Sequence, residues 1–302
     1  MSASPEFGRV VVFGAGLIGG SFALALKAAG QAEEIVGFGR SVATLTQAMN
    51  LGIIDRIGVN AGQEIAGASL VLLATPVGQI PRIMERIAPY LGEKGGGALV
   101  TDACSTKTGV VEAARGLLGE NIGCFVPAHP IAGAENSGAL AARADLYREK
   151  RVVLTPLPEN SALDVARVRS AWEWCGARVC ELTHERHDGV FAAVSHLPHL
   201  LSFALVHELA GRENSEELFG FAAGGFRDFT RIAASHPEMW RDICLSNREA
   251  LLGELDCYFA RLEYLRFALD QGDGEALERV FGAARAARCA WVDSACFEQK
   301  ND

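Results

Sequence analysis

The sequence has 302 residues, enough for two domains with substantial cores, and its 49% hydrophobic and 22% charged residues are typical of a globular protein. Its formal net charge of −9 excludes a protein that mainly binds nucleic acid, because such proteins need a basic face. No apolar run reaches the roughly 18 residues of a membrane span, and the first residues lack the pattern of a signal peptide. The eight cysteines form no C-x-x-C pair, so we expect reduced thiols in a cytoplasmic protein.

Up to residue 182, short apolar runs alternate with segments of helical spacing. Strands are predicted at residues 9–13, 34–38, 69–75, 97–103, 124–130, 151–156 and 177–182. Gly or Pro bounds these runs, and helical segments separate most of them. This alternation is typical of an α/β fold with a doubly wound sheet of the Rossmann type. We therefore assign residues 1–182 to one α/β domain.

A glycine-rich turn follows the first strand. Residues 14–19 read G-A-G-L-I-G and match the G-x-G-x-x-G pattern of dinucleotide-binding turns, with a strand before the turn and a helix opening inside it. The first glycine permits a tight turn, the second lets a pyrophosphate approach, and the third lets helix and strand pack closely. The predicted cofactor-binding residues on this edge of the sheet are Gly14, Gly16, Leu17, Ile18, Gly19 and Thr75.

The end of the second strand predicts which dinucleotide binds. An NAD site carries Asp or Glu there to bind the ribose 2′-hydroxyl, but this chain has Gly39, Arg40 and Ser41. Arg40 can pair with a 2′-phosphate and Ser41 can donate a hydrogen bond to it. We therefore predict NADP as the cofactor, with Arg40 and Ser41 in its site. The alternative is a solvated Arg40 in an enzyme that also uses NAD.

Two polar side chains follow later strands at the same sheet edge. Ser105, in T-D-A-C-S-T-K (101–107), either faces a nicotinamide or caps the helix that follows. His129, in P-A-H-P-I-A-G-A-E-N-S-G (127–138), precedes Pro130, which favours an extended backbone. A histidine at this edge is a candidate general base.

After residue 182 the chain contains long segments with helical spacing and no convincing strand. We assign residues 183–302 to an all-α C-terminal domain. Its helices are very apolar, so we expect part of their surface to pack against a second subunit, with a self-contained helical core as the alternative. Within S-H-L-P-H (195–199), Pro198 cannot donate a hydrogen bond to the carbonyl of Val194 and predicts a kink or a freed polar group in the helix. His196 and His199 have metal-ligand spacing, but no ligand pattern accompanies them, so we predict no metal.

Further along, the sequence around residues 224–240 combines glycines and arginines ahead of Trp240. Arg227, Asp228 and Arg231 lie in this segment. Such a composition suits a site for an anion, and a surface ion pair is the alternative interpretation.

Five motifs together resemble the prephenate/arogenate (cyclohexadienyl) dehydrogenases of tyrosine biosynthesis. They are G-x-G-L-I-G-G-S, T-D-x-x-S-x-K, H-P-I-A-G-x-E, H-D-x-x-x-A-x-x-S-H-L-P-H and G-F-R-D-F-T-R-I-A, and they extend in this order over nearly the whole chain. The resemblance implies a Rossmann domain followed by a helical dimerisation domain, and therefore a homodimer. It also implies oxidative decarboxylation of prephenate, arogenate or both, with hydride transfer to a nicotinamide cofactor.

The resemblance also implies roles for individual residues. His129 takes the proton of the ring hydroxyl, Ser105 orients the nicotinamide or His129, and Arg231 holds a substrate carboxylate. The other residues that it places at the substrate, as pocket lining or polar gate contacts, are His199, Ser195, Glu135 and Asp228. Asp228 is expected to act across the dimer.

Several alternatives remain open at this point. Many members of this family have Asp at the end of the second strand, so a strictly prephenate-specific, NAD-dependent enzyme is one alternative. Others are a dehydrogenase of β-hydroxyacids or imino acids with similar architecture, and a non-catalytic NADP sensor. An enzyme dedicated to arogenate needs a carboxylate or carbonyl near the substrate amine, and Glu181, Glu185 and Asp188 are candidates. We expect dual specificity, with arogenate slightly favoured because NADP use often accompanies it in this family.

Overall fold

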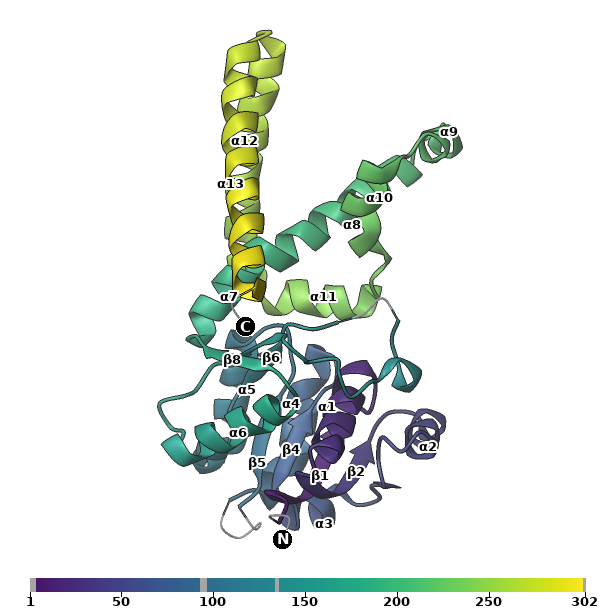
Figure 1. Cartoon of the computed structure of the whole chain (residues 1–302), viewed down its shortest axis with the longest axis vertical. Coiled ribbons are helices and arrows are strands. Elements are labelled where there is room, and N and C mark those ends of the chain that lie inside the picture. Colours follow the sequence, from purple (N-terminus) through teal and green to yellow (C-terminus); the bar gives the residue numbers. More distant parts are fainter. Residues whose placement is uncertain (1–3, 93–96, 134–135, 301–302) are drawn as a thin grey trace. The chain divides into compact units, whose positions relative to one another are not determined.

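The computed structural model describes residues 4–92, 97–133 and 136–300, with side chains up to residue 292. Its contacts divide the chain into two compact units, Met1–Leu251 and Leu252–Asp302 (Figure 1). Each unit is described by itself below.

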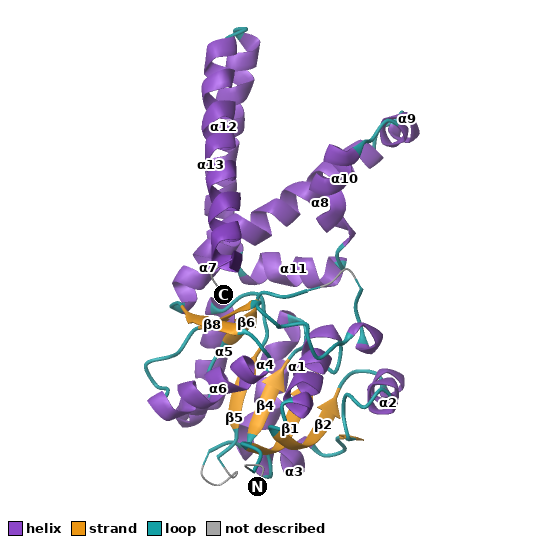
Figure 2. Cartoon of the chain, viewed as in Figure 1, coloured by secondary structure: helices purple, strands orange, loops and turns teal. Residues whose placement is uncertain are grey.

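The first unit is built around a parallel five-stranded sheet, whose strands are orange in Figure 2. The strands are β1 (Phe7–Phe13), β2 (Ala32–Phe38), β3 (Arg56–Ile57), β4 (Leu70–Leu73) and β5 (Leu99–Asp102). Their spatial order is β3-β2-β1-β4-β5, and all neighbours pair in parallel. The order reverses between β1 and β4, which is where open α/β sheets bind ligands at their carboxyl ends.

Both faces of this sheet are covered by helices. Along β1, Val10 and Val12 pack into one apolar cluster while Val11 and Phe13 pack into the other, as the twofold periodicity of a strand requires. The first cluster includes residues of α1 and α6, and the second includes residues of α3, α4 and α5. The helices of this domain are α1 (Leu17–Ala28), α2 (Val42–Asn50), α3 (Ala61–Ala66), α4 (Ile80–Ile87), α5 (Thr108–Leu118) and α6 (Ala162–Trp174). The predicted doubly wound α/β domain is confirmed.

A second, three-stranded sheet continues from the first. It contains β6 (Ala128–Pro130), β7 (Arg151–Leu154) and β8 (Arg178–Glu181). β6 runs antiparallel to β7, and β7 runs parallel to β8. The backbone N–H of Val126 donates to the carbonyl of Val100 at 2.9 Å, so the chain entering β6 lies beside β5. This hydrogen bond brings the predicted base His129 to the edge that carries the glycine turn.

The structure is helical from residue 184 onward, as predicted. In the first unit these helices are α7 (His184–Phe191), the π-helical η6 (Ala192–His196), α8 (Leu197–Ala210), α9 (Ser215–Gly220), α10 (Gly224–Thr230) and α11 (Pro237–Ser246). The π-helical turn ends two residues before Pro198, so the helix is distorted next to this proline but continues through it. Short 3₁₀ turns elsewhere are η1 (Val77–Gln79), η2 (Ala88–Tyr90), η4 (Gly119–Cys124), η5 (Ala139–Ala141) and η7 (Arg231–Ala234).

The continuous stretch His184–Ala210 is long and apolar enough to cross a membrane by length and composition alone. The sequence predicted no such segment, because polar residues interrupt each apolar run. These polar residues include His187, Asp188 and His196, which the structure buries against the rest of the first unit. A helix that provides buried polar contacts of this kind is adequately explained as part of a globular fold.

The second unit contains most of α12 (Arg248–Asp270) and all of α13 (Gly274–Lys300). The division between the compact units therefore falls after Leu251, whereas the change from mixed α/β to all-α structure falls near residue 182. One strand and two helices of the first unit were missed in the sequence. β3 has two residues, and α3 and α9 have six each, too few for a periodic pattern.

Candidate active site

The glycine turn between β1 and α1 leaves no room for side chains at two of its three glycines. Gly14 has a φ of +96°, and a Cβ atom there would lie 2.4 Å from the carbonyl oxygen of Ala74. A Cβ atom on Gly19 would lie 2.2 Å from the carbonyl oxygen of Gly14. At Gly16 the nearest atom to such a Cβ is the Cα of Gly138, at 4.0 Å, so this position is open. The turn is therefore tight where helix and strand meet and accessible where a pyrophosphate would approach.

The surroundings of this turn fit a dinucleotide. Leu17 and Ile18 begin α1, and the Ile18 carbonyl accepts a hydrogen bond from the Tyr147 hydroxyl at 2.6 Å. Thr75 follows β4 at the same edge, and its Oγ1 is buried without a hydrogen-bond partner. A buried hydroxyl in this state is costly unless a ligand completes its bonding. These residues thus fit the dinucleotide that the glycine pattern predicts.

Arg40 and Ser41 lie at the end of β2, as predicted. Ser41 caps α2, because its Oγ accepts a hydrogen bond from the Thr44 N–H at 3.4 Å, which leaves its O–H free to donate. The Arg40 side chain is 70% exposed, and its Nη1 lies 3.8 Å from Oε1 of Glu238 on α11. This exposed ion pair contributes little free energy.

His129 lies in the middle of the short strand β6, where it pairs with Val153. The ring is buried, and its Nδ1 lies 2.8 Å from Nε2 of His187 on α7. Burial lowers the pKa of His129 well below its usual value, and the nearby His187, Lys107 and His196 lower it further. His129 is therefore neutral at physiological pH, and its Nε2 is the ring nitrogen left for a substrate.

The loop that carries Ser105 is held by buried charges on both sides of it. Lys107 is fully buried; its Nζ pairs with the carboxylate of Asp102 and donates to the Ala128 carbonyl at 2.6 Å. The N-terminus of α5 is capped by Asp188 of α7, which accepts hydrogen bonds from the N–H groups of Lys107 and Thr108, each at 2.8 Å. Asp188 therefore caps this helix, and the alternative prediction that Ser105 caps it is not borne out.

A second group of residues gathers around Trp240 on α11. The His199 ring stacks on the Trp240 ring with centroids 3.6 Å apart, and His199 Nδ1 donates to the Ser195 carbonyl at 2.9 Å. Burial lowers the pKa of His199, the bond to Ser195 opposes this, and the charge of Arg231 lowers the pKa further. Arg231, at the start of η7, is therefore close enough to His199 to act on it electrostatically. His199, Trp240 and Arg231 thus lie in one region.

Two further substrate residues were predicted, Asp228 and Glu135. Asp228 is exposed on α10, and Glu135 lies outside the described residues. The three carboxylates that were considered as partners of an arogenate amine already interact with other groups. Glu181 pairs with Arg169, Glu185 lies 3.2 Å from His184, and Asp188 caps α5. The structure therefore offers no support for a preference for arogenate through these three groups.

Among the described residues, no group of three or more His, Cys, Asp or Glu side chains is arranged to hold a metal ion.

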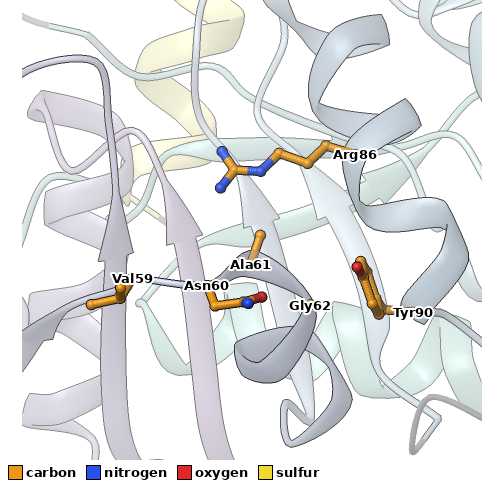
Figure 3. A pocket seen from close by; sticks show the side chains of 6 residues that line it. All are labelled: Val59, Asn60, Ala61, Gly62, Arg86 and Tyr90. Atoms are coloured by element: carbon orange, nitrogen blue, oxygen red, sulfur yellow. The ribbon is translucent and has the colours of Figure 1, made fainter.

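A surface recess of about 220 Å³ lies elsewhere, lined by Val59, Asn60, Ala61, Gly62, Arg86 and Tyr90 (Figure 3). Asn60 to Gly62 belong to the start of α3, and Arg86 extends over them from α4. The recess is formed by residues outside the predicted site.

Sequence reasoning missed the contacts of His129. Its ring lies against those of His187 and Phe191, and the charge of Lys107 acts on it. The H-D pair at 187–188 was visible as part of a motif, but its spacing from His129 predicted no contact. Asn247 donates to the Asp188 carbonyl at 2.9 Å and lies 3.0 Å from Nδ1 of His196, which ties α11 to α7.

Comparison with known proteins gives consistent matches. Residues 22–181 match the family described as "Prephenate dehydrogenase, nucleotide-binding domain", and residues 183–283 match "Prephenate dehydrogenase, dimerization domain". Prephenate dehydrogenase of Bacillus subtilis is 37% identical over 92% of this chain and 75% of its own length. Cyclohexadienyl dehydrogenase of Zymomonas mobilis is 35% identical over 94% of this chain and 96% of its own.

A solved structure agrees with these matches. Prephenate dehydrogenase from Aquifex aeolicus, in complex with hydroxyphenyl propionate and NAD⁺, superimposes with a TM-score of 0.86 and 34% sequence identity. The superposition covers 96% of this chain and 99% of that one.

Proposed function

Because the chain belongs to the prephenate dehydrogenase family, we propose that it catalyses the oxidative decarboxylation of prephenate and arogenate, with hydride transfer to NADP. The observation that carries the proposal is His129: a neutral, buried imidazole with one nitrogen left for a substrate, at the sheet edge that carries the glycine turn. A nicotinamide dinucleotide is the cofactor of this family's oxidoreductases, and the turn fits it.

His129 is the proposed base for the ring hydroxyl. Its Nε2 accepts the hydroxyl proton as hydride leaves the carbon that bears the hydroxyl, and a bound nicotinamide supplies the acceptor for that hydride. The ring carboxylate then leaves as CO₂, and the electrons of the broken C–C bond make the ring aromatic. His129 returns the proton to the phenolic oxygen, so no net proton is released. Ser105 is proposed to orient the hydroxyl or the imidazole.

The group around Trp240 is the proposed substrate-binding region. Arg231 presents a planar guanidinium that binds a carboxylate at two points, and its electrostatic effect on His199 supports its position here. His199 keeps Nε2 as an acceptor, because its Nδ1 donates to the Ser195 carbonyl. Asp228 and Glu135 are proposed as polar contacts at the entrance, with Asp228 supplied to the partner subunit's site.

NADP is the proposed cofactor rather than NAD. Arg40 and the free O–H of Ser41 suit a 2′-phosphate, and the weak ion pair of Arg40 with Glu238 is easily displaced by a doubly charged phosphate.

We also propose that the chain acts in the cytoplasm, with no nucleic acid or membrane partner, and that its domains divide near residue 182.

A homodimer is proposed through the helical region. The second unit consists of two helices, which cannot bury their own apolar side chains. The exposed apolar side chains on α12 and α13 include Leu252, Phe259, Leu262, Phe267, Leu269, Phe281 and Trp291. A second copy of the chain covers such a surface, in agreement with the dimerization domain of the matched family.

Steady-state kinetics with both substrates and both cofactors test the proposed function. We expect reduction of the cofactor with prephenate and with arogenate, and a kcat/KM for NADP at least ~10-fold above that for NAD, the effect of one charged contact worth about 1.4 kcal/mol. The products are 4-hydroxyphenylpyruvate and tyrosine, each formed with CO₂. Reduction with β-hydroxyacids but with neither cyclohexadienyl substrate would contradict the proposal.

A further inference from the structure

Behind His129 lies a pair of buried polar residues that the proposed reaction does not use. His187 and Asp188 are consecutive on α7, and both are almost fully buried. His187 Nε2 lies 2.8 Å from His129 Nδ1, and His187 Nδ1 lies 2.8 Å from Asp188 Oδ1. The three side chains therefore form one hydrogen-bonded chain that starts at Asp188 and ends at the proposed base.

From these contacts we propose that His187 and Asp188 are positioning residues. They hold His129 in the tautomer with its lone pair on Nε2, and they stabilise the proton that His129 gains. This inference rests on the proposed function of His129, because it assigns the two residues a role in the same reaction.

The donors and acceptors leave one consistent arrangement. Burial raises the pKa of Asp188, but the hydrogen bonds from His187, Thr108 and Lys107 outweigh it and lower the pKa below its usual value, so Asp188 is an acceptor. His187 must then donate through Nδ1–H. Burial lowers the pKa of His187, although its bond to Asp188 opposes this, so the ring is neutral and Nε2 carries a lone pair. That lone pair accepts from His129 Nδ1–H, which leaves Nε2 of His129 unprotonated.

The same chain acts when His129 becomes charged. Lys107, fully buried and facing His129 from the loop before α5, opposes a positive charge on its ring, as do His187 and His196 when protonated. A neutral His187 that accepts from His129, backed by the carboxylate of Asp188, counters this repulsion. A buried cation is costly without such a partner. In many enzymes a carboxylate holds the histidine that acts as general base. Here the carboxylate of Asp188 holds His187, and His187 in turn holds the proposed base His129.

Asp188 also links the base to the loop that carries Ser105. Its carboxylate accepts from the N–H groups of Lys107 and Thr108 at the start of α5, an eleven-residue helix, and its charge is favourable at that end of the helix. Its backbone carbonyl accepts from the side chain of Asn247, the residue that follows α11. A single residue thus fixes the positions of the base, of the Ser105 loop and of the helix that carries Trp240.

Substitution of His187 is the better test, because every replacement of Asp188 also disturbs the hydrogen bonds at the start of α5. An asparagine at 188 would direct its NH₂ group either at the His187 and Lys107 donors or at the Thr108 N–H, so each orientation sets the NH₂ group against at least one donor. His187→Gln keeps an acceptor near the position of Nε2, whereas His187→Leu removes it. His184→Gln is the matched control, since His184 lies on the same helix outside the chain of hydrogen bonds.

We expect His187→Leu to lower kcat with prephenate by about 100-fold, the size of effect typical of a misplaced general base, with little change in KM or in NADP affinity. His187→Gln recovers about tenfold of this loss, and His184→Gln behaves as the unaltered enzyme does. A kcat of His187→Leu within about threefold of the unaltered enzyme overturns the inference.

Nitrogen-15 NMR of histidine-labelled protein tests the tautomer without any substrate. The expected spectrum has His129 protonated at Nδ1 and unprotonated at Nε2, with both forms present in His187→Leu. A His129 protonated at Nε2 in the unaltered enzyme overturns the inference. If the enzyme does not oxidise prephenate at all but the spectrum is as expected, the proposed function fails while the positioning of His129 stands.

Discussion

At the scale of single residues, the neighbours of a side chain decide what it can do. The pKa of His129 is held low by burial and by His187, Lys107 and His196, and His187 occupies its Nδ1, which suits the proposed role as a base. The sequence placed His129 at the end of the predicted strand 124–130, and the structure has it on β6. The contacts were not predictable, because 58 residues separate His129 from His187 and no local pattern encodes such a distance.

Arg231 gives a prediction at this scale. Arg231→Ala removes the guanidinium proposed to bind a substrate carboxylate, while His129 and its partners remain in place. We expect KM for prephenate to rise by about 10- to 100-fold, the usual effect of losing a charged hydrogen bond. Initial-rate measurements at saturating NADP check this, with Arg227→Ala as a neighbouring control. An unchanged KM would remove Arg231 from the carboxylate site.

At the scale of elements, the sequence predicted those strands and helices whose apolar pattern is long enough to be periodic. The strands around Val11, Val71 and Val100 follow apolar runs bounded by Gly or Pro, and all three were found. The sequence did not predict β3 and α3, because both are too short to show a periodic pattern. The cap of α5 was also missed, since its donor groups lie on one element and its carboxylate on another. Local patterns predict elements, and long-range pairing decides which polar groups meet.

A second prediction concerns the amino-terminal edge of the sheet. Glu34 on β2 binds Arg9 of β1 at 2.7 Å and Arg56 of β3 at 2.6 Å, and Arg56 in turn binds Glu64. The hydrogen bonds from Arg56 and Arg9 lower the pKa of Glu34 to about 2. This lowered pKa means that the ionised form stabilises the fold above pH ~4.3, the ordinary glutamate value, and that the stabilisation is lost as pH falls towards 2.

Thermal unfolding of Glu34→Gln checks this sign. We expect the Tm of the variant to lie about 2–3 °C below that of the unaltered protein at pH 7, the shift produced by ~1 kcal/mol in a domain of this size. The difference should shrink as pH falls from about 4.5 towards 2. A difference that is constant over this range would show that the charge of Glu34 is not responsible. Glu33→Gln, next to it on β2, is the matched control.

At the scale of the whole molecule, the exposed apolar surface of the helical region matters most. Phe259 and Phe267 on α12 and Phe281 on α13 are each more than half exposed in a single chain. We expect the purified protein to sediment at twice the mass of one chain and Phe267→Glu to weaken this association, because a charge in a covered apolar interface is costly. A protein that sediments as a monomer at micromolar concentration would contradict the homodimer.

The central claim is that His129 is the base of a decarboxylating dehydrogenase, and His129→Asn tests it most directly. The measurement is kcat for cofactor reduction with prephenate, together with NADP affinity measured by titration in the absence of substrate. Asparagine retains a hydrogen-bonding side chain but cannot take a proton, so we expect kcat to fall by at least ~100-fold while NADP affinity is unchanged. Turnover at the unaltered rate would contradict the account.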